Sequence, residues 1–290
     1  MEIIGEKLNA TRAEVAEAIA SRDVDRVQDL ARRQVESGAA YLDVNAAGVQ
    51  KSKEPGDLVW LVESVQAAVE VPLCLDSANP EALTAALGVV QRTPLVNSIS
   101  AEAERLDPIL PLVASHGCSV IALAADETGI GKTVEQRMAV VRQLVRATRA
   151  AGVPDAHVLV DPLVLPLAGL ATSGAVTLDT MRTIRDEFPD VRLCLALSNL
   201  SFGLPERALI NRVFLTLALA AGLDVALLDP MNAQMMQEYV AAEMVLGRDP
   251  FCRRYTQAYR GGRFGFPGRG ASAAAGVDGI RRDDAAAGGR

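Results

Sequence analysis

The chain has 290 residues, a formal net charge of −7 and a pI near 5.0; half of its residues are apolar and only 4% are aromatic. This length fits one or two domains, and the acidic balance argues against a nucleic-acid-binding groove. Because no apolar run is long enough to cross a bilayer and no secretory leader opens the chain, we expect a cytoplasmic protein without membrane association.

Short apolar runs alternate with longer amphipathic segments along the chain, which is typical of βα units and a parallel sheet. Strands are predicted over residues 2–6, 40–45, 71–76, 94–98, 119–126, 157–162, 192–199 and 224–230. Eight such strands predict a (β/α)₈ TIM barrel as a domain of residues 1–260. A doubly wound open sheet is the alternative, but no glycine-rich phosphate loop follows the first strand.

The segment from Gly261 to Arg290 differs from the rest of the chain. It consists mainly of Gly, Ala, Arg and Asp and has no apolar periodicity. Such a composition cannot form a packed core, so we expect residues 261–290 to be a low-complexity, disordered C-terminal tail.

The four cysteines form no CxxC pair, and three of them lie in apolar runs of the strand type. These three, Cys74, Cys118 and Cys194, are predicted to be buried free thiols in a reducing compartment.

A carboxylate or carboxamide stands at or near the carboxyl end of every predicted strand. These residues are Glu6, Asn45, Asp76, Asn97, Asp126, Asp161, Asn199 and Asp229. Any one of them could simply cap a helix or form a turn. In a parallel barrel, however, all eight converge on the rim that carries active sites, so together they predict a shared polar pocket.

Other residue types exclude several kinds of chemistry. The two histidines, His116 and His157, lie near a helix end and at a strand start, which argues against a His-ligated metal site, and we expect no metal. The lysines lie outside the predicted strands, Lys7 being the nearest, so a Schiff-base enzyme is disfavoured. The string GIGKT resembles a P-loop, but Asp126 stands where that loop needs glycine.

Converging carboxylates and carboxamides suit a flat, neutral heterocycle that presents both N–H and C=O groups. A pterin has these features. A sugar or a metal-bound acid could use similar groups, so the residue types alone leave these ligands open.

The motifs IIGEKLNATR (3–12), LCLDSANPEAL (73–83), VLVDPLVLP (158–166) and ALSNLSFGLPERALINRVFL (196–215) occur in this order. Together they resemble the methyltetrahydrofolate:corrinoid methyltransferases, a branch of the pterin-binding TIM-barrel superfamily that also contains the dihydropteroate synthases. The resemblance extends from the first residues to about residue 258.

The resemblance implies a role for each matching residue. Asp76, Asn97 and Asp161 would hold the pterin, and Asn199 would lie near the N5 atom that carries the methyl group. With Glu6 and Asn45 at the same rim these form the expected substrate site, in which Asn199, Asp161 and Asp76 are the expected catalytic residues. Two positions depart from the family pattern, since Glu206 and Asp126 stand where relatives often carry asparagine.

The implied activity is methyl transfer between N5 of methyltetrahydrofolate and the Co(I) of a corrinoid. The resemblance also implies that a separate corrinoid protein carries the cobalt, and this is consistent with the absence of the corrinoid-binding motif D-x-H-x-x-G, whose glycine position is Val160 here. Members of the family are typically homodimers. The alternatives are a condensing enzyme similar to dihydropteroate synthase, disfavoured because no basic residue ends the last strand, and a catalytically silent pterin-binding subunit. The sequence does not distinguish tetrahydrofolate from tetrahydromethanopterin, or the direction and pathway of transfer.

Overall fold

The structure is a computed structural model and describes residues 1–48 and 51–262. Eight parallel strands of this described part close into a barrel in the order β1-β10-β9-β8-β5-β4-β3-β2. The strands are β1 (Glu2–Asn9), β2 (Tyr41–Asn45), β3 (Leu73–Asp76), β4 (Leu95–Ile99), β5 (Ser119–Leu123), β8 (Val158–Asp161), β9 (Arg192–Ala196) and β10 (Val225–Leu228). The predicted TIM barrel is therefore confirmed.

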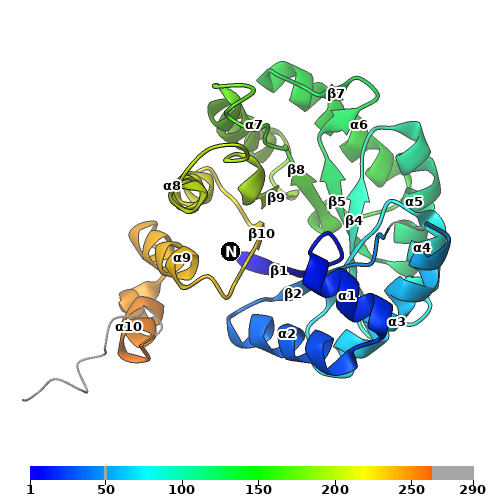
Figure 1. Cartoon of the computed structure of the whole chain (residues 1–290). Helices are drawn as coiled ribbons and strands as arrows, with labels where there is room; N and C mark the ends of the chain where they lie inside the picture. Colours follow the sequence, from blue (N-terminus) through cyan, green and yellow to red (C-terminus); the bar gives the residue numbers. More distant parts are fainter. Residues whose placement is uncertain (49–50, 263–290) are drawn as a thin grey trace, which may run out of the picture.

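Helices surround the strands, as Figure 1 shows. They are α1 (Ala13–Ser21), α2 (Val24–Glu36), α3 (Glu54–Gln66), α4 (Pro80–Leu87), α5 (Ala103–His116), α6 (Val134–Ala150), α7 (Ser173–Glu187), α8 (Arg207–Ala220), α9 (Ala233–Val245) and α10 (Arg253–Arg260). Local signals start several of them. Asn79 caps α4, Asn232 caps α9, and Thr133 forms a capping box with Gln136 at the start of α6.

The barrel has two apolar layers. Between strands and helices lies the larger core, built mainly from Val, Leu, Ile and Ala. Inside the barrel, nearly every strand contributes one buried residue to a smaller cluster: Ile4, Cys74, Leu95, Ile121, Leu159, Cys194 and Val225, with Tyr41 packed against it. This inner layer fills the barrel below its carboxyl-terminal end, so a ligand can enter only above it.

A bulge in β1 changes which side chains face the interior. Ile4 pairs with Tyr41, but Asn9 pairs with Asn45, so β1 has one residue more than β2 over this stretch. The extra residue turns Asn9 inward and Leu8 toward the helices. Gln34 of α2 holds the bulge, since its Oε1 accepts a hydrogen bond of 3.0 Å from the Lys7 N–H. A Cβ on Gly5 would lie 2.6 Å from this oxygen, so any other residue here would displace the Gln34 side chain that holds the bulge.

Several predicted strands were wrong at their carboxyl ends. The strand predicted over 2–6 continues to Asn9, and the strand predicted over 192–199 stops at Ala196, so Asn199 lies in a 3₁₀ turn. The predicted strand 119–126 was also wrong at its end. β5 stops at Leu123, and Asp126 belongs to a separate hairpin of β6 (Ala125–Asp126) and β7 (Gly129–Ile130). The predicted tail lies outside the described residues from 263 onward and stays a prediction. Cys74, Cys118 and Cys194 are buried free thiols, as expected. None of the helices in the described part is long and apolar enough to cross a membrane.

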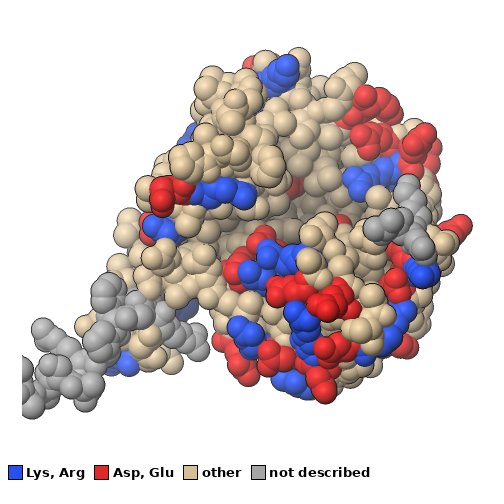
Figure 2. All heavy atoms as spheres, viewed as in Figure 1, with Lys and Arg blue, Asp and Glu red and all other residues tan. Residues whose placement is uncertain are grey.

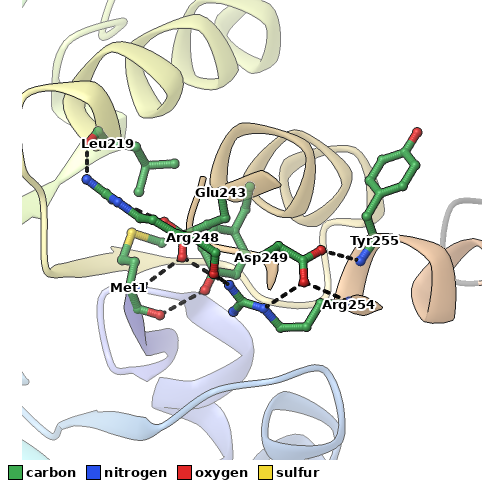
Figure 3. Close-up of polar contacts among 8 residues, drawn as sticks. Met1, Leu219, Glu243, Arg248, Asp249, Arg254 and Tyr255 are labelled. Atoms are coloured by element: carbon green, nitrogen blue, oxygen red, sulfur yellow. Dashed lines mark hydrogen bonds and ion pairs between the residues drawn. The ribbon is translucent and has the colours of Figure 1, made fainter. Parts of the chain in front are cut away.

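A charge cluster joins the two ends of the barrel chain (Figure 3). Glu243, 3% exposed on α9, accepts from Arg248 at 3.1 Å, from the amino group of Met1 at 3.3 Å and from Arg254 at 3.4 Å. Asp249 caps the start of α10 through the backbone N–H groups of Arg254 and Tyr255. Burial acts to raise the pKa of Glu243, but the Met1 amino group and Arg248 outweigh it, so this pKa lies below its usual value.

We therefore expect Glu243→Gln to lower the free energy of unfolding by about 2–3 kcal/mol at pH 7, because it leaves three cations around a neutral group. The depressed pKa means that this contribution is present at neutral pH and is lost as the pH falls through the folded-state value. Urea unfolding at several pH values would measure it. Glu238→Gln on the same helix, at a residue with no ion pair in the described part of the chain, is the control. Equal losses in the two variants would contradict the assignment.

Candidate active site

A polar layer lies directly above the inner apolar cluster. Outside β1, where the bulge interrupts the alternation, the residues two positions beyond the cluster and Tyr41 are Asp43, Asp76, Asn97, Leu123, Asp161, Ala196 and Leu227. The polar members are therefore grouped on β2, β3, β4 and β8. In a strand, residues two apart share a face, so these four side chains point into the barrel. Figure 2 shows the hollow that opens in the face above them, with charged side chains around it.

Five of the site residues are joined by amide–carboxylate contacts of 2.9–3.5 Å. Asn45 Nδ2 donates to Asp76 Oδ2 at 2.9 Å. Asn9 Nδ2 lies 3.4 Å from the same oxygen and 3.5 Å from Asp43 Oδ2. Asn97 Nδ2 donates to Asp43 Oδ1 at 3.3 Å. The structure thus brings together the predicted residues Asn45, Asp76 and Asn97 and adds Asn9 and Asp43, which the sequence analysis missed.

In this network Asp43 is buried and Asp76 is half-buried, and neither carboxyl group has an ion pair among the described residues. Burial and the nearby charge of Asp76 raise the pKa of Asp43 to about 8. Burial also raises the pKa of Asp76, against the hydrogen bond from Asn45 and the charge of Arg105. Two carboxylates so close in a low-dielectric interior do not both ionise at neutral pH, so the pair carries one negative charge there.

Asp161 is held by backbone groups on the opposite side of the polar layer. The Leu163 N–H donates to Asp161 Oδ1 at 2.7 Å, and the Ala196 N–H is a second donor. Burial nevertheless raises the pKa of Asp161 to about 6. Because Ala196 ends β9 three residues before Asn199, Asp161 is tied to the start of the turn that carries Asn199.

A buried arginine fixes the loop that orients Asp161. Arg137, in α6, is fully buried; its Nε donates to Gly131 O at 2.8 Å, and its Nη1 donates to Leu163 O at 2.8 Å and Thr177 Oγ1 at 2.7 Å. Leu163 has φ +63°, a left-handed conformation that a leucine adopts only when its surroundings enforce it. Arg137 binds its carbonyl while Asp161 binds its N–H, so both ends of this residue are held.

Asn199 ends a 3₁₀ turn (Leu197–Asn199) and is exposed, and its side chain makes no hydrogen bond within the described part of the chain. Arg207 supports the loop that follows, since it donates to Ser198 O at 2.9 Å and to Ser201 Oγ at 3.1 Å and lies over the ring of Phe202. Asn199 is therefore an exposed polar group on a loop that Arg207 holds in place. In the same loop Glu206 has φ +50°, a conformation that asparagine adopts more readily.

Glu6 lies in a separate charged group on the rim. Its Oε1 is 3.3 Å from Arg12 Nη2, and burial raises its pKa despite that charge. Next to it, Lys7 Nζ forms an ion pair of 2.7 Å with Asp229 Oδ2. Asp126 points away from the barrel, because its Oδ1 accepts from the N–H and hydroxyl of Thr128 in the hairpin. Of the eight predicted strand-end residues, Asp126 alone leaves the shared rim.

Asp43 and Asn9, the two site residues that the sequence analysis missed, differ in whether the sequence could have revealed them. Asp43 shares a face with Asn45 in the run YLDVN, so strict alternation would have found it. Asn9 could not be found in this way, because it faces inward only after the bulge.

Among the described residues, the site presents unpaired acceptor oxygens, because the amino groups of its asparagines already donate to the carboxyl groups. Asn45 and Asn9 have their own carbonyl oxygens bound by backbone N–H groups of Ala47 and Thr11, so their amino groups must face the carboxylates. Asp76 Oδ1 and Asn97 Oδ1 accept no hydrogen bond from the described residues. Such a surface binds a ligand with several N–H groups along one edge. No group of three or more His, Cys, Asp or Glu side chains in the described residues could hold a metal ion.

Comparison with known proteins gives a consistent picture. The family model of pterin-binding enzymes matches residues 5–229. A methylcorrinoid:tetrahydrofolate methyltransferase from Eubacterium limosum is 38% identical over 267 residues, which cover 91% of this chain and 98% of that protein. Methionine synthase from Mycobacterium tuberculosis is 31% identical over 85% of this chain, which corresponds to 22% of that enzyme. Dihydropteroate synthase from Yersinia pestis has the same fold, with a TM-score of 0.63 at 16% identity over 85% of this chain and 93% of that one.

We expect Arg137→Met to lower the free energy of unfolding by about 3 kcal/mol, because buried hydrogen bonds to a charged donor are lost. Arg142→Met is the matched control on the same helix. Its ion pair with Glu187 is exposed to solvent and should contribute little to stability. Denaturant midpoints of the two variants would test this, and similar losses would show that Arg137 does not hold the Asp161 loop.

Proposed function

The chain belongs to the pterin-binding enzyme family, and from this premise we propose that it transfers a methyl group between N5 of methyltetrahydrofolate and the cobalt of a corrinoid. A separate corrinoid protein carries the cobalt. The observation that carries the proposal is the full-length match to a methylcorrinoid:tetrahydrofolate methyltransferase, on a barrel whose interior presents a layer of hydrogen-bond acceptors. The enzyme is thus a one-carbon transferase with a folate substrate.

The acceptor layer suits the donor edge of a pterin. Its 2-amino group and ring N–H groups need oxygen acceptors, and Asp76, Asn97 and Asp161 supply them from β3, β4 and β8. A carboxylate facing two adjacent N–H donors forms the strong paired contact of this type. Asn45 and Asn9 hold Asp76 from behind, which leaves its other oxygen for the ligand. Glu6 lies on the rim above this layer and completes the proposed pocket.

Methyl transfer from N5 requires a change of charge at that atom. A tertiary amine releases its methyl group to a nucleophile only when the nitrogen gains a proton or a growing hydrogen bond. Asn199 is the exposed amide next to the site, and Asp161 lies at the base of its turn. We assign to Asn199, with water and Asp161 or Asp76, the stabilisation of protonated N5, which acts in the transition state more than in the ground state.

The remaining parts of the proposal concern assembly and location. A homodimer is supported by an exposed apolar stripe on α8, where Leu209, Val213 and Leu217 follow at every fourth residue and are 47–52% exposed. A stripe of this kind on a helix is typical of a protein interface. The acidic chain and its free thiols support a cytoplasmic location.

Asn199→Ala is expected to lower the rate of methyl transfer by about 10²–10³, the usual cost of removing one donor that acts in the transition state. Purified protein, methyltetrahydrofolate and Co(I) cobalamin would be mixed without oxygen, and the methyl-Co(III) absorbance followed. Folate affinity should stay within about threefold, since a donor acting only in the transition state adds little to ground-state binding. Tight folate binding by the unmodified protein without any transfer would favour the catalytically silent subunit, and no folate binding would reject the assignment.

A second prediction concerns the acidic side of the pH profile. Because the pKa of Asp161 is raised to about 6, this acceptor becomes protonated as the pH falls below that value. Affinity for methyltetrahydrofolate should therefore decrease below pH 6 in the unmodified protein. Asp161→Asn should bind at least about tenfold more weakly at pH 7, the cost of a good hydrogen bond to a charged group, and should lose this pH dependence. Calorimetric titration between pH 5 and 7.5 measures both, and an unchanged acidic decline in the variant would assign it to another group.

A further inference from the structure

Asp43 lies beneath the proposed ligand site and touches two of the groups that shape it. Its side chain is 2% exposed and belongs to the inner face of β2. Asn97 donates to one of its oxygens, and Asn9 reaches the other. The same Asn9 amide also reaches Asp76, so a single N–H₂ group lies between the two carboxyl groups. Asp43 itself belongs to the polar layer, two residues before Asn45, which ends β2 at the rim.

Asp43 determines which end of Asn97 faces the cavity. Because Nδ2 of Asn97 points down to Asp43 Oδ1, the carbonyl Oδ1 of Asn97 is left for the ligand. An apolar residue in place of Asp43 would remove this constraint, and Asn97 could then present a donor instead of an acceptor. The direction of one buried bond therefore sets the hydrogen-bond pattern that the ligand meets.

The pair formed by Asp43 and Asp76 has no cation in contact with it among the described residues, and its donors are neutral: asparagine amides and, for Asp43, also the Cys74 thiol. A second negative charge at this position would be buried and uncompensated, which is strongly unfavourable. A ligand that covers the pocket removes more water from the pair. Binding is then coupled to retention of the proton, so the affinity decreases once Asp43 ionises.

We propose that Asp43 is a positioning residue that stays protonated beneath the site, orients Asn9 and Asn97, and thereby sets the alkaline limit of folate binding. The inference rests on the proposed folate site. The raised pKa of Asp43, about 8, places this limit just above neutral pH.

Other titratable groups near Asp43 do not account for such a limit. The thiols of Cys74 on β3 and Cys194 on β9 are buried, which raises their pKa well above the usual value, so both remain neutral. Asp161 changes charge on the acidic side. Asp76 is the neighbour that carries the negative charge, and Glu54 and Arg105 act on Asp76 from α3 and α5.

The test compares the affinity for methyltetrahydrofolate of the full-length protein, Asp43→Asn and Asp43→Ala between pH 6.5 and 9.5. In the unmodified protein Kd should rise above pH 8, approaching about tenfold per pH unit for one proton. Asp43→Asn keeps a neutral group of the same shape and should bind within about threefold at pH 7, with no alkaline rise. Asp43→Ala should bind about tenfold more weakly at every pH, because the Asn97 and Asn9 contacts are gone. Cys118→Ala, at a buried thiol whose raised pKa has burial as its cause and no link to Asp43, is the control and should keep the alkaline rise.

Three results would overturn the proposal. They are a Kd that does not change with pH in the unmodified protein, an alkaline rise in Kd that persists in Asp43→Asn, or a loss of affinity of about a hundredfold (~2.7 kcal/mol) in that variant at pH 7.

A second measurement is independent of folate. A raised pKa in the folded state means that the unmodified protein loses stability relative to Asp43→Asn from about pH 4 up to pH 8, after which the difference is constant. Thermal unfolding of both proteins gives this difference in Tm, and parallel curves over pH 5–9 would show that Asp43 is ionised. If the unmodified protein binds no methyltetrahydrofolate, the proposed function fails while the Tm comparison still decides the protonation of Asp43.

Discussion

Three carboxyl groups lie inside one barrel, and none of them contacts a cation in the described part of the chain. The properties of the site depend on this arrangement. Carboxylates in such a place need donors, and Asp43, Asp76 and Asp161 receive them from asparagine side chains and backbone N–H groups. Neutral donors offset only part of the cost of removing charge from water. The remaining cost appears as raised pKa values and as acceptor oxygens that a ligand with N–H groups can satisfy.

The barrel meets this condition through its layers. The inner apolar cluster closes the bottom, so the polar layer above it is shielded from water on one side and open on the other. Arg137 lies outside the pocket and holds the loop that orients Asp161. Its charge acts on Asp161 through the protein, but its hydrogen bonds go to the loop and not to the carboxylate. Asp161 therefore keeps an environment in which its charge responds to pH near neutrality.

The strands were predictable from the sequence because buried parallel strands are short apolar runs, and the barrel follows from their number. The polar rim was predictable where a side chain ends a strand, as at Asp76 and Asn45. Prediction failed at Asp126, where a local hairpin competes with the strand, and it missed Asn9, whose direction depends on the register between β1 and β2. Arg137 was also missed, since a lone arginine in an amphipathic helix gives no sign that it is buried. The tail and the roles of the site residues remain predictions.

The bulge in β1 makes the number of residues in this strand important for the site. Between Gly5 and Asn9 the chain contains one residue more than its neighbour β2, and Gln34 on a surrounding helix secures it. Deletion of one residue between Gly5 and Leu8 would remove the bulge but leave Leu8 opposite Val44 and Asn9 opposite Asn45, on the faces they now occupy. Regular pairing of the unshortened strand with β2 would instead exchange Leu8 and Asn9 between the helix-packed core and the pocket. An alignment with relatives that lack the extra residue therefore needs a one-residue gap between Gly5 and Leu8.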